Sequence, residues 1–315
     1  MTTTTTTNTM RAVVSTHGGT ARTELRDVPV PEPAPDEALV EVRAFAVNRG
    51  ELTLIAMRDE WQPGQDVAGV VARQAADGSG PPAGTRVAGL AEWHGWAQYV
   101  GVPTVRLAKL PDAVDDVAAA ALPMAGTTAI GVLEQGGPLL GRRVLVTGAS
   151  GGVGRYAVQL AAIGGAEVTA VARPERADEL RALGAGDVVA ATADAPDNAF
   201  DLILESDGGA SLEAAVGKVV PRGTIVVFGN SSREPSRIGF VEFAQGGAHG
   251  ARMVAYLSHQ HAHHAGRRLR TLVELVAAGR LDPGVGYEAS WEDLNGALDA
   301  LEQRRFSGKA VLRVT

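Results

Sequence analysis

Short, unbroken hydrophobic runs alternate with helical patterns through the middle of the chain. Residues 144–146 are all β-branched or aliphatic, which is typical of a strand buried on both faces of a parallel sheet. The apolar positions of residues 153–161 then fall on one helical stripe, and residues 167–172 indicate the next strand. Further buried strands are predicted at 187–190, 200–204 and 223–228, with helical segments at 175–183 and 212–219 between them. This alternation of strand and helix predicts a doubly wound parallel sheet.

The first third of the chain shows a different pattern. Shorter strands, punctuated by Gly and Pro, are predicted at 11–15, 23–28, 38–47, 66–73 and 86–90, and they favour a small, mostly antiparallel, barrel-like β domain. The stretch between residue 48 and residue 63 is expected to be a short loop. From residue 115 an alanine-rich stretch predicts two helices separated at Pro123.

The last part of the chain, after residue 257, predicts two helices and one terminal strand at 310–314. One strand and two helices are too little for a core of their own, so this part is expected to return to the β domain. The predicted domains are therefore a discontinuous β domain at 10–117 and 258–315, an inserted α/β domain at 118–257, and a flexible tail at 1–9.

A glycine-rich turn directly follows the first strand of the α/β pattern. Gly148, Gly151 and Gly154 lie three residues apart, with Gly152 added. In a dinucleotide-binding turn the first glycine permits the bend, the second lets the backbone approach the pyrophosphate, and the third allows close helix packing. The following helix presents unpaired N–H groups to the phosphates. The turn therefore predicts a dinucleotide site, against the alternative of a loop that only turns a corner.

Composition narrows the classes of function. The chain has 315 residues, of which 45% are hydrophobic and 21% charged, as in a globular protein of two domains. Its formal charge of −7 argues against nucleic acid as a partner. The chain has no cysteine, which excludes disulfides and thiolate metal sites and agrees with a cytoplasmic location. It has no signal-peptide pattern and no apolar run of membrane-spanning length, so no membrane partner is expected.

A set of motifs in a fixed order resembles the medium-chain dehydrogenase/reductase superfamily, and within it the zinc-free quinone oxidoreductase branch. The resemblance covers nearly the whole chain from Met10 and rests on PGQDVAGVV at 63–71, GWAQY at 95–99, LPMAGTTAI at 122–130, TGASGGVG at 147–154, LGAGDV at 183–188 and FSGKAV at 306–311. It implies an α/β fold in which a Rossmann-type doubly wound parallel sheet is inserted in a GroES-like, mostly β barrel-like domain. The cleft between the two domains is then the expected active site.

The resemblance also bears on zinc. In the zinc alcohol dehydrogenases of the family, a cysteine, a histidine and a further cysteine or acid hold the catalytic metal. The matching positions here are Asn48, Gln65 and Met124, which are not a plausible zinc set. We therefore expect no metal and no zinc-assisted chemistry. Asp66 matches an acid of the zinc relatives and is expected to make backbone hydrogen bonds near the cofactor cleft.

The residues after the second strand of the α/β pattern predict the cofactor. An acidic residue at the end of that strand would bind the ribose 2′-hydroxyl of NADH. Arg173 and Arg176 occur there instead, and two guanidinium groups suit the 2′-phosphate of NADPH. Glu175 supports the competing NADH interpretation, and exposed helix arginines with no cofactor role are the other alternative.

Further site residues follow from position in the family. Cofactor contacts are implied for Asn48, near the nicotinamide, for Thr127 or Thr128, Thr147, Gly148, Ala149, Gly151, Gly152, Val153, Gly154, Gly229, Asn230 and Ser231, and for Gly308 with Lys309. The family often has a tyrosine at the position of Thr53, so a tyrosine proton relay is in doubt here. Arg49 or Glu51 is expected to line the substrate pocket, unless these are only solvated loop charges.

Two histidine features could indicate a different chemistry. The histidine-rich run at 259–264 lacks a cysteine or a nearby acidic partner, so we expect no metal there. His94 is expected to be structural or at the pocket edge.

These features together predict an NADPH-dependent, zinc-independent oxidoreductase that transfers a hydride to a quinone or an α,β-unsaturated carbonyl compound. The alternatives are a specialised reductase of a biosynthetic intermediate, including reduction coupled to ring closure, and a non-catalytic NADPH-binding protein. A small-molecule substrate is expected in the first two cases. The resemblance also implies a homodimer, formed by edge pairing of the α/β sheets through the segment after Gly223.

Overall fold

The chain folds into two compact units. The structure is a computed structural model that describes residues 8–17, 21–245 and 248–315. The first unit combines the chain up to Thr127 with Ala262–Thr315, and the second unit is Thr128–His261. The inserted arrangement expected from the sequence is therefore present, whereas the domain limits at 117/118 and 257/258 stay a prediction. The predicted tail at 1–9 lies outside the described residues except for its last two, and the first strand already begins at Thr9.

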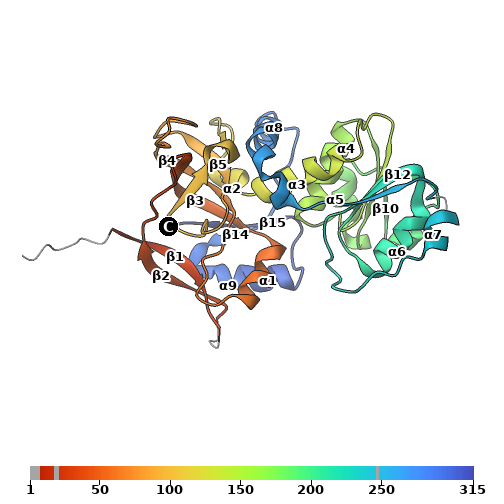
Figure 1. Ribbon diagram of the computed structural model, residues 1–315, viewed down its shortest axis with the longest axis horizontal. Helices are drawn as coiled ribbons and strands as arrows, with labels where there is room; N and C mark the ends of the chain where they lie inside the picture. Colours follow the sequence, from red (N-terminus) through yellow and green to blue (C-terminus); the bar gives the residue numbers. More distant parts are fainter. Residues whose placement is uncertain (1–7, 18–20, 246–247) are drawn as a thin grey trace, which may run out of the picture. The chain divides into compact units, whose positions relative to one another are not determined.

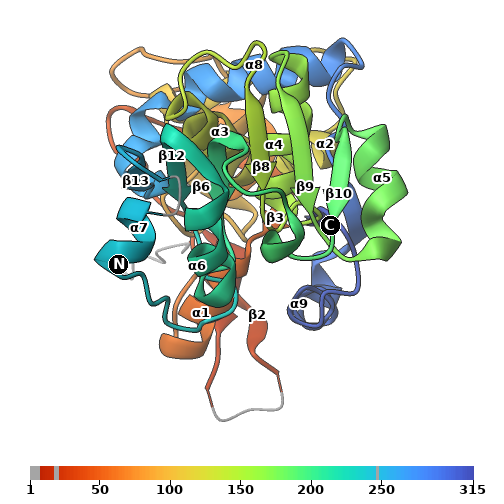
Figure 2. The same cartoon turned by 90° about the vertical axis from the view of Figure 1, so that its right-hand side faces the viewer.

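The second unit is built on a six-stranded sheet in the order β10-β9-β8-β11-β12-β13. All neighbouring pairs are parallel, as expected for the doubly wound pattern. The strands are β8 (Arg143–Val146), β9 (Glu167–Val171), β10 (Asp187–Val189), β11 (Phe200–Glu205), β12 (Val219–Val227) and β13 (Arg252–Ala255). Figure 2 shows β8, β9 and β10 side by side, with helix α5 beyond β10.

Helices connect these strands. They are α3 (Pro123–Glu134), which carries the chain into the second unit, then α4 (Gly152–Ile163), α5 (Ala177–Ala182), α6 (Gly209–Lys218) and α7 (Phe240–Gln245). Leu145, Ile203 and Ile225, on three neighbouring strands, are fully buried in one core cluster. Because these strands are buried on both faces, their sequences are continuous apolar runs.

The first unit contains a seven-stranded, mostly antiparallel sheet and a separate hairpin, β1 (Thr9–Ser15) with β2 (Thr23–Pro29). The sheet order is β14-β15-β3-β4-β5-β7, and β6 pairs with β3. Its strands are β3 (Glu37–Val47), β4 (Asp66–Arg73), β5 (Arg86–Leu90), β6 (Tyr99–Pro103), β7 (Leu107–Lys109), β14 (Val285–Ser290) and β15 (Lys309–Arg313). The helices are α1 (Arg49–Met57), α2 (Asp116–Ala120), α8 (Ala265–Ala277) and α9 (Leu294–Glu302). Figure 1 shows α1 beside α9, in agreement with their contacts.

The return of the C-terminal segment is confirmed by strand pairing. β15 pairs antiparallel with β3, and β14 pairs parallel with β15. The shared core includes Phe45 and Trp96 of the first third together with Trp291 and Leu298 of the last part. Neither part alone has this core, so the first unit needs both ends of the chain.

Two expectations about local structure are wrong. The segment after Asn48 was expected to be a loop, but residues Arg49–Met57 form helix α1. Leu52 and Ile55 are buried three residues apart on one face of this helix, which stabilises it against the core. The sequence pattern also missed β7, β13 and β14, which are short or have half-exposed residues on both faces. Among the described residues, no helix has the length and apolar character to cross a bilayer.

Candidate functional site

The strand order of the second unit reverses direction between β8 and β11. β8 lies between β9 and β11, and the chain runs outward through β9 to β10 before it crosses back to β11. Ligands of open α/β sheets bind outside the carboxyl ends of the strands at such a reversal of order. The turn after β8 and the turn after β11 therefore define the candidate nucleotide site.

The glycines after β8 have the conformations that a dinucleotide turn requires. Gly148 has φ of 57°, a left-handed conformation that favours glycine. A Cβ atom on Gly154 would lie 2.3 Å from the carbonyl oxygen of Gly148, so only glycine lets α4 approach the turn this closely. Gly151 is the N-cap of α4, and the first turn of that twelve-residue helix begins at Gly152. The structure thus fits the predicted roles of the first and third glycines.

A buried carboxylate ties the strand ends together. Glu205, the last residue of β11, is fully buried and accepts hydrogen bonds from the Thr147 hydroxyl at 3.2 Å, Asp207 N at 3.1 Å and Gly208 N at 3.0 Å. The Ser231 hydroxyl, after β12, donates to Asp207 Oδ1 at 2.7 Å. These bonds hold the predicted cofactor residues Thr147 and Ser231 against the turn after β11. Sequence reasoning missed Glu205, although an acid at the end of an apolar strand was the available signal.

Basic residues follow β9 at the same edge of the sheet. Arg173 is exposed, and Arg176 is half-buried with its Nη1 3.8 Å from Glu179 Oε2. The other oxygen of Glu179 forms an ion pair with Arg155, a buried residue in the first turns of α4. One carboxylate is therefore shared by two guanidinium groups, whereas the side chain of Arg173, directly after β9, is exposed.

The first unit contains a buried polar cluster made by Asn48, Asp66 and Lys309. Lys309 Nζ lies 2.9 Å from Asp66 Oδ2, and the two side chains are 3% and 0% exposed. The ammonium also donates to Asn48 Oδ1 at 2.6 Å and Val47 O at 3.2 Å, while Asn48 Nδ2 donates to Asp66 Oδ2 at 3.0 Å. The structure thus brings together Asn48 and Lys309, which the sequence had placed in one site only by resemblance.

Asp66 also receives a backbone hydrogen bond, as expected. Met124 N, at the start of α3, donates to Asp66 Oδ1 at 2.6 Å. The ion pair with Lys309 was not foreseen, because its partners lie 243 residues apart in the sequence. Removal of either partner of such a buried ion pair leaves the other charge buried without compensation, which strongly destabilises the fold.

Glu51 lies beside this cluster and is also buried. Its Oε2 accepts from the backbone N–H of Asn48 at 2.7 Å, which is the return bond of a capping box at the start of α1. Its Oε1 is buried and has no hydrogen-bond partner among the described residues. Burial, together with the negative charge of Asp66, raises the pKa of Glu51 from 4.5 to about 8, and the Asn48 N–H and Lys309 only partly oppose this. The raised pKa favours the neutral, protonated form of this carboxyl near neutral pH.

The remaining predicted residues of α1, and Thr127 of α3, do not take part in the buried cluster. Arg49 is exposed and its Nη2 donates to Leu301 O at 3.3 Å, and Thr53 is exposed on α1. On α3 the Thr127 hydroxyl is buried and donates to Pro123 O of its own helix at 2.5 Å. Of the two alternatives for the substrate pocket, Glu51 is buried beside the cluster, whereas Arg49 is exposed. The catalytic and cofactor roles of these residues stay predictions.

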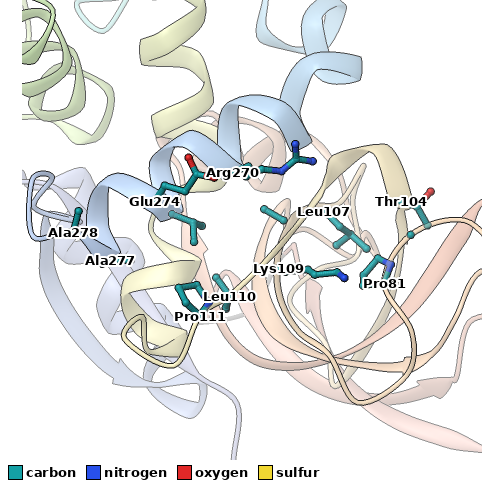
Figure 3. Close-up of a pocket in the computed structure, with 13 residues that line it drawn as sticks. Pro81, Thr104, Leu107, Lys109, Leu110, Pro111, Arg270, Glu274, Ala277 and Ala278 are labelled. Atoms are coloured by element: carbon teal, nitrogen blue, oxygen red, sulfur yellow. The ribbon is translucent and has the colours of Figure 1, made fainter.

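A groove of about 930 Å³ opens on the first unit between β7 and α8. Figure 3 shows Arg270 and Glu274 projecting from α8 and Lys109 from the strand opposite. No predicted site residue lines this groove. It lies on different elements from the buried cluster and is not the candidate site.

Replacing Lys309 by Met should destabilise the protein by about 3–5 kcal/mol, because it leaves the Asp66 carboxylate buried without a cation. The measurement is denaturant unfolding of the full chain. The control is Arg313→Met on the same strand, whose ion pair with Glu288 is half-exposed and should contribute less than about 1 kcal/mol. A smaller loss in the double variant Asp66→Asn/Lys309→Met than in Lys309→Met would support the pairing, and equal or greater loss would contradict it.

The pH dependence of stability should report the Glu51 proton. Since the pKa of Glu51 rises from 4.5 to about 8 on folding, its contribution is fully present below pH 4.5 and is lost as the pH rises through 8. The free energy of unfolding should therefore fall with pH in this window, relative to Glu51→Gln, with a slope of up to about 1.4 kcal/mol per pH unit. Parallel pH profiles for the parent and Glu51→Gln in urea unfolding would show that Glu51 is ionised in the folded protein.

Comparisons with known proteins agree with this geometry. Residues 177–312 match the family model described as zinc-binding dehydrogenase. The chain is 34% identical over 192 residues to the chloroplastic quinone-oxidoreductase QR1 of Triphysaria versicolor, covering 55% of this chain and 57% of that protein. It is 29% identical over 310 residues to the 2-methylene-furan-3-one reductase of Solanum lycopersicum, covering 91% of this chain and 74% of the reductase.

A third relative is a much larger protein. The chain is 33% identical over 309 residues to the erythronolide synthase EryA2 of Saccharopolyspora erythraea, covering 89% of this chain but 8% of the synthase. This chain thus spans a small part of the synthase and little more than half of the quinone-oxidoreductase.

A solved structure supports the fold. A mycobacterial protein complexed with NADPH superposes with a TM-score of 0.81, at 23% identity, over 97% of this chain and 99% of the other. The fold is therefore the expected Rossmann-type parallel sheet inserted in a GroES-like, mostly β domain. On these motifs, relatives and fold, the chain belongs to the medium-chain dehydrogenase/reductase superfamily, in its quinone oxidoreductase-like branch.

Proposed function

We propose that this protein is an NADPH-dependent, zinc-independent reductase of quinones or α,β-unsaturated carbonyl compounds. The observation that carries the proposal is the glycine turn at the strand-order reversal, where Gly148 is left-handed and Gly154 sits against its carbonyl oxygen. This turn fits a dinucleotide, and the exposed Arg173 fits a 2′-phosphate. The mycobacterial neighbour that binds NADPH and the relatives named as quinone and furanone reductases support the same cofactor and substrate class.

The donor set argues for zinc independence, although the matched family model is described as zinc-binding. At the three positions that match zinc ligands, the Asn48 amide is bonded to Asp66 and Lys309, the Gln65 amide donates to Glu92 O at 3.2 Å, and Met124 offers a thioether. Two amides and a thioether are poor ligands for zinc. The cation within this cluster is the Lys309 ammonium.

The buried cluster supplies polar groups for the reaction. NADPH, when bound, supplies a hydride for the electrophilic carbon of the substrate. Reduction of a conjugated carbonyl also consumes one proton. The raised pKa of Glu51 favours a protonated carboxyl next to Asn48, and we propose that this carboxyl supplies the proton for this step. The side-chain NH2 group of Asn48 has a second N–H besides the one that donates to Asp66. We propose that this second N–H donates a hydrogen bond to the substrate or the cofactor.

A second candidate function is reduction of a biosynthetic intermediate, with or without ring closure. It is favoured by the match of 89% of this chain to part of the erythronolide synthase. The cofactor and the hydride step are the same in both proposals, so the substrate alone separates them.

The segment directly after Gly223 lies in β12, which pairs with both β11 and β13, so the expectation that it forms a free sheet edge is wrong. We also propose a homodimer that forms along β13, the edge strand of the second unit. Met253 on this strand is 39% exposed and Leu257 just after it is 48% exposed, so an apolar edge is available for pairing. A dimer mass in sedimentation of the full chain is expected, and a monomer at all concentrations would reject the interface. The cytoplasmic location stays a prediction.

The function is tested by following NADPH absorbance with a panel of quinones, enones, enals and enoyl thioesters. We expect turnover of at least one quinone or enone. Turnover confined to enoyl thioesters would favour the biosynthetic candidate. Tight NADPH binding without turnover of any compound would contradict both and support the non-catalytic alternative.

Substitution of Arg173 by Ala should raise the KM for NADPH by about tenfold and leave the KM for NADH unchanged, because it removes one charge-assisted contact to the 2′-phosphate. The matched control is Arg181→Ala on α5, whose exposed guanidinium pairs with Asp178. Steady-state kinetics with both cofactors measures the effect. An unaltered NADPH KM in Arg173→Ala would remove Arg173 from the cofactor contacts, and a parent that prefers NADH would support the contact by Glu175.

A further inference from the structure

Two loops leave the sheet of the first unit at the end where Asp66 lies. One loop, residues 58–65, leads into Asp66 at the start of β4, and the other, residues 91–95, follows Leu90 at the end of β5. Asp66 and Leu90 are partners in the strand pairing, so both loops lie at the same end of the sheet. This is also the end that carries the buried cluster.

The two loops are fastened to each other. Gly95 N donates to Gly64 O at 2.9 Å and Ala91 N to Gln65 O at 2.8 Å. The Gln65 side chain adds a bond to Glu92 O at 3.2 Å. The pair of loops is therefore one structural feature, on which side chains keep fixed relative positions.

Each loop carries a half-buried tryptophan, and the two rings meet. Trp61 and Trp93 pack edge to face with centroids 5.0 Å apart. The guanidinium carbon of Arg58 lies 5.0 Å from the centre of the Trp61 ring, a cation–π contact that orients an exposed cation. An oriented guanidinium beside an aromatic wall suits a flat, anionic ligand.

The charges around Arg58 leave its guanidinium available. Asp59 accepts a hydrogen bond from His17 N at 2.8 Å, and Glu60 is paired with Arg26. Glu92, on the facing loop, lies 3.9 Å from Arg106. Within 8–17, 21–245 and 248–315, Arg58 itself has no ion pair.

The backbone next to each tryptophan is strained. Glu60, directly before Trp61, has φ of 54°, and His94, directly after Trp93, has φ of 67°. Non-glycine residues seldom adopt this left-handed conformation, which costs free energy and is retained where the surrounding structure or a ligand requires it. Each of the two left-handed residues is the direct sequence neighbour of a tryptophan, an observation separate from the ring contacts.

The separation from the reaction site indicates the size of the ligand. Arg58 is the C-cap of α1, a helix of nine residues, and Asn48 is its N-cap. The two caps are ten residues apart, which at 1.5 Å per residue places them about 15 Å from each other. A ligand that reaches both is longer than a bare quinone.

We propose that Arg58, Trp61 and Trp93 form a subsite for the anionic, planar end of an elongated substrate whose conjugated carbonyl group is reduced near Asn48. This inference rests on the proposed reductase function and names its substrate class. Arg58 binds the carboxylate or similar anion, and the tryptophans pack against the flat part between the anion and the reacting carbon. The subsite selects anionic conjugated carbonyl compounds over neutral ones of the same shape.

The test compares 4-(3-oxobut-1-enyl)benzoate with its methyl ester, two enones of similar shape that differ in charge, as substrates with NADPH. Arg58→Met should raise the KM for the acid about tenfold relative to the ester, without a matching change in kcat. Trp61→Leu should raise the KM for both compounds, and Trp61→Phe should retain most of the affinity. The control is Arg43→Met on β3, an exposed arginine paired with Glu41, which should change neither KM.

Equal effects of Arg58→Met on acid and ester, or no effect on either, would overturn the subsite. If the parent reduces neither compound, calorimetry with the saturated acid 4-(3-oxobutyl)benzoate separates the two proposals. Binding by the parent that is lost in Arg58→Met would keep the subsite and count against the reductase function. Absence of binding by the parent would overturn the subsite itself.

Discussion

The buried ion pair of Lys309 and Asp66 is the interaction on which the first unit depends. It joins the C-terminal strand β15 to β4 across 243 residues of sequence, and Asn48 and Met124 N complete its hydrogen bonds. Neither charge would be stable in this interior alone. The pair therefore fixes the start of α1 and the start of α3 relative to the sheet. It also sets the electrostatic environment in which Glu51 keeps its proton.

The second unit depends on a steric constraint instead of a charge. The left-handed Gly148 and the contact of Gly154 with its carbonyl oxygen bring α4 close to the end of β8. The Glu205 carboxylate then ties the turn after β11 to Thr147. The two units supply different parts of the proposed chemistry, since one is built to hold a dinucleotide and the other to hold a matched set of buried polar groups.

The sequence predicted the second unit almost completely, because strands buried on both faces are continuous apolar runs and the glycine turn has a steric signature. It failed at α1, where charged residues suggested a loop, although Asn48 and Glu51 at capping-box spacing were the available signal. The ion pair of Asp66 with Lys309 could not be predicted from local pattern, because it depends on the long-range pairing of β15 with β3 and of β3 with β4. The sequence also could not show which of Arg49 and Glu51 points into the core. The structure shows that the Glu51 side chain is buried and the Arg49 side chain is exposed.

We propose above all that the cluster of Asn48, Asp66 and Lys309 supports NADPH-dependent reduction through its own buried charges, without a metal ion. The most direct measurement is kcat/KM for NADPH-dependent reduction by protein that has been treated with a chelator and shown to be free of metal by elemental analysis. We predict the same kcat/KM before and after metal removal, and no gain when zinc is added. Loss of activity on chelation, restored by zinc, would contradict it.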